Sequence, residues 1–241
     1  MSAWLGAGAA AASEPLLMPP VERERAEARL IFLPEDLAAL DAPLAPNERR
    51  VLVTGAYSSG DRFAPEGFVL RAGDARLARL QGWDGLLLVD REGRASLHHV
   101  TAVRHGGETF DLRDRPARRA FLDIAEAEAI STVQSHLLIN EGALDLSPKL
   151  GAPRFRRRLL FETADGRIGV YDSSPRLLTL YEAAADLKAE QQPRFALNLD
   201  MGTYDFCELQ SPDGAEQCGA LDRRRIDKLT NVLAFTLPAD R

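Results

Sequence analysis

Short apolar runs, separated by turn residues, dominate the pattern of hydrophobic and polar positions along the chain. Runs of about four to eight residues bounded by Gly, Pro, Asn or Asp are typical of β-strands. They predict strands over residues 29–33, 50–54, 67–71, 85–90, 95–103, 156–163, 167–171, 194–200 and 231–237. Residues 132–146 are expected to be extended as well. The turn signals at 90–94 and at Asp165-Gly166 predict hairpins between neighbouring strands.

Three segments have helical features instead. Residues 34–42 predict a short capped helix, and residues 115–129 and 176–191 predict longer ones. One face of the last segment carries Leu177, Leu180, Tyr181, Ala184 and Leu187. Because the helices do not alternate regularly with the strands, a doubly wound sheet is disfavoured. We therefore predict an α+β fold, a single domain over residues 29–241 with a mixed, largely antiparallel sheet and a few packed helices.

Composition supports one folded domain and argues against a nucleic-acid-binding protein and against a membrane-spanning one. The chain has 241 residues, of which 45% are hydrophobic and 27% charged, enough apolar material for a sizeable core. A net charge of −6 argues against a general affinity for nucleic acid. No apolar run approaches the roughly eighteen residues that span a bilayer, so no membrane span is expected.

Residues 1–28 are expected to precede the domain as a signal-like or flexible segment. Ala3 to Ala12 are small and mostly apolar, and they end in an Ala-x-Ala pattern before Ser13, as at a signal-peptide cleavage site. The segment lacks the usual basic start, so an Ala-rich tail remains the alternative. Export would place the protein in the periplasm or outside the cell, and a tail would leave it cytoplasmic.

The two cysteines, Cys207 and Cys218, flank a Pro-Asp-Gly turn at residues 212–214. Two strands folded back at this turn would bring the thiols together. We therefore predict a disulfide formed in an oxidising compartment. Two unrelated buried thiols are the alternative.

The clearest candidate for chemistry is Asp200, which ends an apolar strand two residues before Gly202. Strand alternation places Asn198 and Asp200 on the face opposite Phe195, Leu197 and Leu199. A carboxylate there is suited to acid–base or nucleophilic work, although an Asp that caps its own loop would look the same.

An arginine run at residues 156–158 offers a candidate anion clamp. On a strand, Arg157 takes the face opposite Arg156 and Arg158. We predict that Arg157 points into the same cavity as Asp200, with the other two facing away. A run of this kind is otherwise a solvated strand face. The adjacent histidines His98 and His99 should point to opposite faces, so they cannot easily share one metal ion.

Six short motifs follow one another over roughly residues 50–237. They are Thr54-Gly55-Ala56-Tyr57, Pro65-Glu66-Gly67-Phe68-Val69, the Val133-Gln134-Ser135-His136 segment that runs on to Gly142, Arg157 nine residues before Gly166, Ala196-Leu197-Asn198-Leu199-Asp200-x-Gly202, and Leu229-Thr230-Asn231-Val232-Leu233. In this order they resemble the motifs of the phosphodiester glycosidases, the family of the enzyme that uncovers mannose 6-phosphate.

The departures from the family pattern fall in the loops. Thr54 stands where the family has Asn, and His136 and Phe161 stand where it has Gly. Met201 replaces another Gly, and Thr203-Tyr204-Asp205 replaces a Gly/Ser run. Larger side chains there would crowd a sugar phosphate, so either the substrate differs or catalysis has been lost.

The resemblance implies a hydrolase that cleaves a sugar 1-phosphodiester or related glycoside in the cell envelope. Asp200 would be one carboxylate, Glu141 or Asp205 the second, and His136 a proton donor to the leaving phosphate. The implied binding residues are Arg157, Gln134, Asn198, Gly202, Asn231 and Thr54. The ligand would be a carbohydrate or sugar phosphate, and neither a metal nor another cofactor is expected. The competing hypotheses are a non-catalytic exported domain that binds a glycan or a protein, and an unrelated α+β domain.

Overall fold

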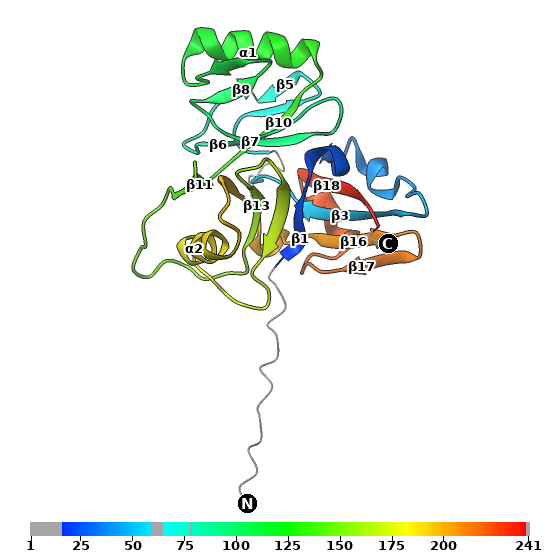
Figure 1. Cartoon of the computed structure of the whole chain (residues 1–241). Helices are drawn as coiled ribbons and strands as arrows, with labels where there is room; N and C mark the ends of the chain where they lie inside the picture. The colour runs from blue at the N-terminus through cyan, green and yellow to red at the C-terminus, as the bar shows by residue number, and fades with distance from the viewer. Residues whose placement is uncertain (1–15, 59–64, 78, 240–241) are drawn as a thin grey trace, which may run out of the picture.

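The computed structural model describes residues 16–58, 65–77 and 79–239. It confirms the α+β prediction: every strand pairing found in these residues is antiparallel, and the strands divide among three main sheets and a small hairpin. Figure 1 shows one sheet at the top under a helix and the other two side by side below it. No helix in the described residues is long and apolar enough to cross a membrane.

The first sheet, called the β13 sheet here, has six strands in the order β1-β14-β13-β15-β11-β12 among the described residues. Its strands are β1 (Leu16–Val21), β11 (Leu137–Asn140), β12 (Ala143–Leu144), β13 (Arg158–Glu162), β14 (Ile168–Asp172) and β15 (Phe195–Asn198). Helix α2 (Leu180–Gln191) packs on one face through Ala183, Ala184 and Leu187.

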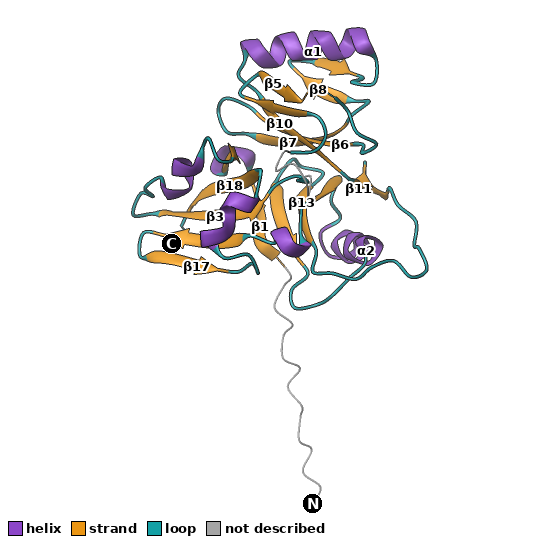
Figure 2. Ribbon diagram, turned by 180° about the vertical axis from the view of Figure 1, so that it is seen from behind, coloured by secondary structure: helices purple, strands orange, loops and turns teal. Residues whose placement is uncertain are grey.

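The second sheet, the β6 sheet, has the order β5-β4-β10-β6-β7 in the described chain. Its strands are β4 (Val69–Arg71), β5 (Asp74–Leu77), β6 (Gly85–Val89), β7 (Ala95–His99) and β10 (Ser131–Ser135). Helix α1 (Arg115–Ala127) covers its outer face, as both views show (Figures 1 and 2). The hairpin of β8 (Val103–His105) and β9 (Glu108–Phe110) lies beside this helix.

The third sheet, the β3 sheet, has the order β17-β16-β3-β18-β2 within the same residues. Its strands are β2 (Glu27–Phe32), β3 (Glu48–Thr54), β16 (Cys207–Ser211), β17 (Gly214–Gln217) and β18 (Asn231–Pro238). Short 3₁₀ helices occur at Arg23–Arg25, Leu37–Asp41, Gly202–Tyr204 and Arg223–Lys228.

One apolar cluster joins the three sheets. It contains buried residues from each, including Val53, Leu233 and Phe235 of the β3 sheet, Leu87, Leu97 and Val133 of the β6 sheet, and Leu160, Val170 and Leu197 of the β13 sheet. The backbones approach closely at Gly85, where an added Cβ would lie only 2.1 Å from a methyl carbon of Leu197. Glycine is therefore required for the β6 and β13 sheets to pack at this distance.

The fold begins earlier than expected, because residues 16–28 are part of it. Strand β1 pairs with β14, and Met18 is fully buried. The sequence did not predict this strand because it contains two prolines, which lack the backbone N–H that a central strand needs. Strand β1 lies at the edge of its sheet, where a missing N–H is tolerated. The signal-like stretch Ala3–Ala12 lies outside the described residues.

Two of the three predicted helices differ from the expectation. Residues 34–42 form turns and the 3₁₀ helix Leu37–Asp41, because a segment this short gains little from α-helical hydrogen bonds. Helix α2 starts at Leu180 because Thr179 and Glu182 form a capping box. Leu177 therefore precedes the helix and is 56% exposed, not on its buried face.

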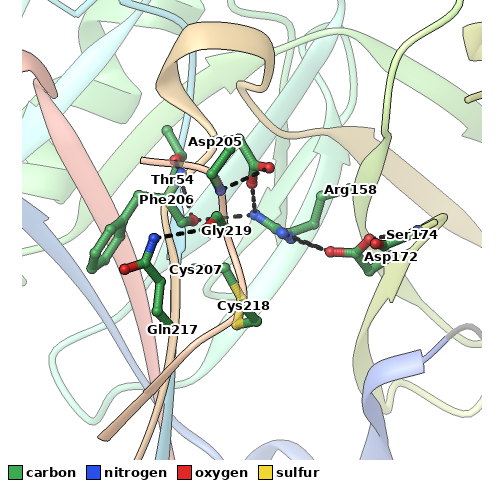
Figure 3. Close-up of a disulfide and its surroundings, with 11 residues drawn as sticks. Thr54, Arg158, Asp172, Ser174, Asp205, Phe206, Cys207, Gln217, Cys218 and Gly219 are labelled. Carbon is green, nitrogen blue, oxygen red and sulfur yellow. Dashed lines mark hydrogen bonds and ion pairs between the residues drawn. A yellow bond between two sulfur atoms is a disulfide. The ribbon is translucent and has the colours of Figure 1, made fainter. Parts of the chain in front are cut away.

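The predicted disulfide between Cys207 and Cys218 is present, with the two Cα atoms 4.9 Å apart (Figure 3). Cys207 begins β16 and Cys218 follows β17, so the bond closes a hairpin at the edge of the β3 sheet. No free cysteine accompanies it.

Beside the disulfide, Arg158 links the β13 sheet to the β3 sheet (Figure 3). Its guanidinium, 1% exposed, binds Asp172 of β14 at 2.6 Å and Asp205 at 3.0 Å. It also donates to the carbonyl oxygen of Phe206 at 3.1 Å. Arg156 is exposed, whereas Arg158 is buried and forms ion pairs inside the protein. The arginine run is therefore not a single solvated strand face.

Replacing both cysteines, Cys207→Ala with Cys218→Ala, should lower the free energy of unfolding by about 2–4 kcal/mol, because the unfolded chain loses a cross-link. Urea unfolding followed by circular dichroism measures this. A reductant should lower the stability of the unmodified protein similarly and leave the double variant unchanged. Equal stability of the two proteins would contradict a stabilising role.

Arg158→Met should lower the free energy of unfolding by about 3–5 kcal/mol, because the carboxylate of Asp205 is left buried without its cation. Arg156→Met is the matched control, and as a surface change it should stay within about 0.5 kcal/mol of the parent. Similar unfolding midpoints for the two variants would show that the buried pairs do not stabilise the fold.

Candidate functional site

The candidate site forms where β15 ends against the loop that follows β3. Asp200 lies two residues beyond β15, and its backbone N–H donates to the carbonyl of Gly55 at 2.9 Å. Its carboxylate accepts from the backbone N–H of Ser58 at 3.2 Å and of Met201 at 3.0 Å. The side chain is thus held between two loops, and the residue is only 8% exposed.

Burial raises the pKa of Asp200 to about 6, because the charged form loses its hydration. The hydrogen bonds from Ser58 and Met201 lower this pKa in part, and the nearby carboxylate of Glu66 raises it. A carboxyl group that titrates near pH 6 can take up or release a proton close to neutrality.

Asn231, an expected binding residue, holds the loop at residues 55–58 in place. Its Oδ1 accepts from the N–H of Ala56 at 2.8 Å and its Nδ2 donates to the carbonyl of Ala56 at 3.3 Å. The amide lies so close to Gly55 that a Cβ there would be 2.0 Å from its oxygen. Asn231 is fully buried, so it positions the backbone that binds Asp200.

Thr54 and Gln134, also expected to bind substrate, are buried and bonded to backbone groups. The hydroxyl of Thr54 donates to the carbonyl of Tyr204 and accepts from the N–H of Phe206. The side chain of Gln134 accepts from the N–H groups of Phe68 and Gln81 and donates to the carbonyl of Trp83. These hydrogen bonds hold in place the backbone at residues 204–206, at Phe68 and at residues 81–83.

An aromatic pair connects these loops to the strand end. The rings of Tyr57 and Trp83 lie with their centroids 4.7 Å apart. The Tyr57 hydroxyl accepts from Nδ2 of Asn198, while burial raises the pKa of this tyrosine. The other side-chain atom of Asn198, Oδ1, is buried without a hydrogen-bond partner among the described residues. Such an acceptor suits a hydroxyl or N–H of a ligand.

Arg157 and His136 line a neighbouring cavity of about 250 Å³. Arg157 donates to the carbonyls of Leu178 and Pro153 at 2.9 and 3.0 Å, and burial lowers its pKa without removing its charge. Nδ1 of His136 is buried and unpartnered within the described chain. Asp200 does not line this cavity, but Tyr57 lies within electrostatic range of both Asp200 and Arg157.

The two residues expected as second carboxylates have other partners. Glu141 binds Arg194 through both oxygens, at 2.6 and 2.7 Å, which lowers the pKa of this glutamate. It lines a different cavity, of about 480 Å³. Asp205 binds Arg158 and the N–H of Ala220 at 3.3 Å. Gly202 has a φ of +80°, which explains its identity, and is exposed.

Sequence reasoning missed three residues of this site, Tyr57, Glu66 and Trp83. Tyr57 and Glu66 fall inside motifs that the resemblance singled out, but neither was given a role there. Glu66 lies close enough to influence Asp200, and its N–H donates to the carbonyl of Tyr57 at 2.8 Å. Nothing in the local sequence marked Trp83.

No protein-family profile and no curated protein sequence matches the chain. Solved structures do resemble it. The catalytic domain of zebrafish N-acetylglucosamine-1-phosphodiester alpha-N-acetylglucosaminidase aligns with a TM-score of 0.52 and 10% identity, over 91% of this chain and 74% of that one.

Two bacterial structures are similar to the same degree. A protein from Synechocystis gives a TM-score of 0.53 at 12% identity, over 89% of this chain and 58% of its own. A protein described as exported from Burkholderia pseudomallei K96243 gives 0.52 at 15% identity, over 90% and 72%. The chain therefore has the fold of a phosphodiester glycosidase catalytic domain, as its motif order predicted.

Proposed function

We propose that the protein is a hydrolase that cleaves a sugar 1-phosphodiester or a related glycoside at the site around Asp200. The observation that carries the proposal is a buried carboxyl group with a pKa of about 6, within electrostatic range of a second carboxylate, just beyond the end of a core strand. The shared fold with a phosphodiester glycosidase catalytic domain supports the reaction class.

Asp200 and Glu66 are the carboxylate pair in this proposal. Hydrolysis at an anomeric carbon passes through an oxocarbenium-like transition state that two carboxyl groups flank. One carboxyl group donates a proton to the departing phosphate oxygen, and the other stabilises the sugar cation or activates water. Glu66 replaces Glu141 and Asp205 as second carboxylate, because Arg194 and Arg158 already occupy those two side chains.

The other polar groups supply recognition. Oδ1 of Asn198 accepts a hydrogen bond from a sugar hydroxyl, and the Tyr57–Trp83 pair offers an aromatic surface for the apolar side of a sugar ring. Arg157 and His136 line one cavity, from which the guanidinium supplies positive charge and the imidazole a hydrogen bond to the phosphate. The ligand is therefore a carbohydrate or a sugar phosphate.

An extracellular or periplasmic location fits the same proposal. Disulfides persist in oxidising compartments, and the bond between Cys207 and Cys218 closes an edge hairpin here. The similar Burkholderia protein is described as exported.

Asp200→Asn should lower turnover of a sugar 1-phosphodiester by about 10²-fold or more, since the variant keeps the shape but cannot exchange a proton. Release of the phosphomonoester from a panel of such diesters, including N-acetylglucosamine 1-phosphodiesters, measures this. Glu66→Gln should show a comparable loss, and the exposed Asp213→Asn should show none. A parent protein that turns over no diester of the panel, or an Asp200→Asn variant of full activity, contradicts the proposal.

The raised pKa of Asp200 also predicts a pH dependence of stability. The folded state holds this proton up to about pH 6, whereas the unfolded chain releases it near its ordinary pKa of about 4. The contribution of Asp200 to stability is therefore present below pH 4 and lost as the pH rises to about 6. Subtracting the unfolding free energies of Asp200→Asn from those of the parent, pH by pH, should reveal this fall. A flat difference would show that the carboxyl titrates normally.

A further inference from the structure

Three side chains with metal-binding atoms converge near the start of β6, where Asp84 follows Trp83 in the chain. Asp84, His99 and Asp145 each place one ligand atom within 4.8 Å of the other two. Asp84 immediately precedes β6, His99 ends β7, and Asp145 follows β12 by one residue. The group therefore joins the β6 sheet to the outer end of the β13 sheet.

The three side chains are close, yet they do not bond to one another. Of the described residues, none of the three forms a hydrogen bond or ion pair with another member of the group, and neither aspartate pairs with a lysine or arginine. One oxygen of Asp84 accepts from the N–H of Leu137 at 3.0 Å. Two carboxylates thus lie close together without a lysine or arginine between them, so a cation at this point would be attracted by both.

The imidazole of His99 is held from one side. Its Nδ1 lies 2.6 Å from the hydroxyl oxygen of Thr101 and 3.2 Å from the backbone nitrogen of the same residue. When Nδ1 donates its proton to the hydroxyl oxygen of Thr101, Nε2 keeps the lone pair that a metal ion requires. Metal-bound histidines commonly donate their other ring N–H to an acceptor in this way.

Arginines near His99 do not oppose a cation at this position. His99 also lines the cavity of about 480 Å³ that contains Arg23 and Arg194. Arg194 is neutralised by Glu141, and Arg23 is paired with Glu162 at 2.6 Å. Arg104 has an exposed side chain and lies 3.8 Å from Glu141.

We propose that Asp84, His99 and Asp145 bind a divalent transition-metal ion, with Zn²⁺ as the best match. Imidazole nitrogen and carboxylate oxygen both bind zinc at about 2.0–2.2 Å, and three protein ligands leave a position for water. An imidazole ligand disfavours Ca²⁺ and Mg²⁺, which prefer oxygen. Asp145 is exposed, so the ion can enter from solvent.

The bound ion has a structural consequence for the candidate site. Asp84 follows Trp83, whose ring packs on Tyr57, and it also binds the N–H of the residue after His136. An ion that ties Asp84 to the end of β12 would therefore restrain both Trp83 and the chain at Leu137. The proposal does not depend on the hydrolase activity, because its test measures metal binding and stability.

The test is calorimetric titration of untagged, chelator-treated protein with Zn²⁺, paired with melting curves. We expect one Zn²⁺ per chain and a higher melting temperature in its presence, since an ion that binds only the folded state stabilises it. Asp145→Asn and His99→Ala should each weaken binding by about tenfold or more. Asp213→Asn and His105→Ala are the matched controls and should bind as the parent does.

The outcomes separate cleanly. Asp145 is exposed, so its variant should fold, and circular dichroism without metal checks this. Absence of stoichiometric Zn²⁺ binding by the parent overturns the proposal, as does equal binding by Asp145→Asn and the parent. Preferential binding of Ca²⁺ over Zn²⁺ would overturn the assigned ligand chemistry.

Discussion

The central apolar cluster is the contact on which the rest of the structure depends. It is built from one face of each of the three sheets. Separating any one sheet would therefore expose the apolar faces of the other two to water. Strands β13 and β15 are buried on both sides: Leu160 and Leu197 face this cluster, while Phe161 and Ala196 face helix α2. A strand packed in this way cannot slip by one residue, because every side chain would change face.

This rigid strand fixes the position of Asp200. The residue lies two positions beyond β15, and the loop at residues 55–58 follows β3 in the adjoining sheet. Because both segments leave the same core, their backbones meet and bond, and the carboxylate is taken out of water. The raised pKa of Asp200 is therefore a consequence of packing between sheets, more than of any charged neighbour.

The buried polar side chains divide into two kinds. Asn231, Thr54 and Gln134 use their hydrogen bonds to hold loop backbones, which satisfies both partners where water is excluded. Oδ1 of Asn198 and Nδ1 of His136 are buried without a partner in the described chain. A buried polar atom without a partner is costly for the fold alone, and a ligand can offset that cost.

The sequence by itself predicted most of the core strands, the α+β class and the disulfide hairpin, and it marked Asp200 as the candidate for chemistry. These features depend on local periodicity, turn residues and strand alternation, all of which involve residues close together in the sequence. The sequence also carried the motif order from which the fold was predicted. It could not reveal β1, because two prolines hide an edge strand whose partner, β14, lies about 150 residues away.

The tertiary structure alone decided which side chains meet. Glu66 comes within electrostatic range of Asp200, while Arg158 and Arg194 pair with the carboxylates of Asp205 and Glu141. Asp84, His99 and Asp145 come from three separate segments, and no spacing along the chain marks them as a group. The physical reason is common to all of these: a side chain's partner across two sheets is set by how the sheets pack, and that packing follows from the whole core.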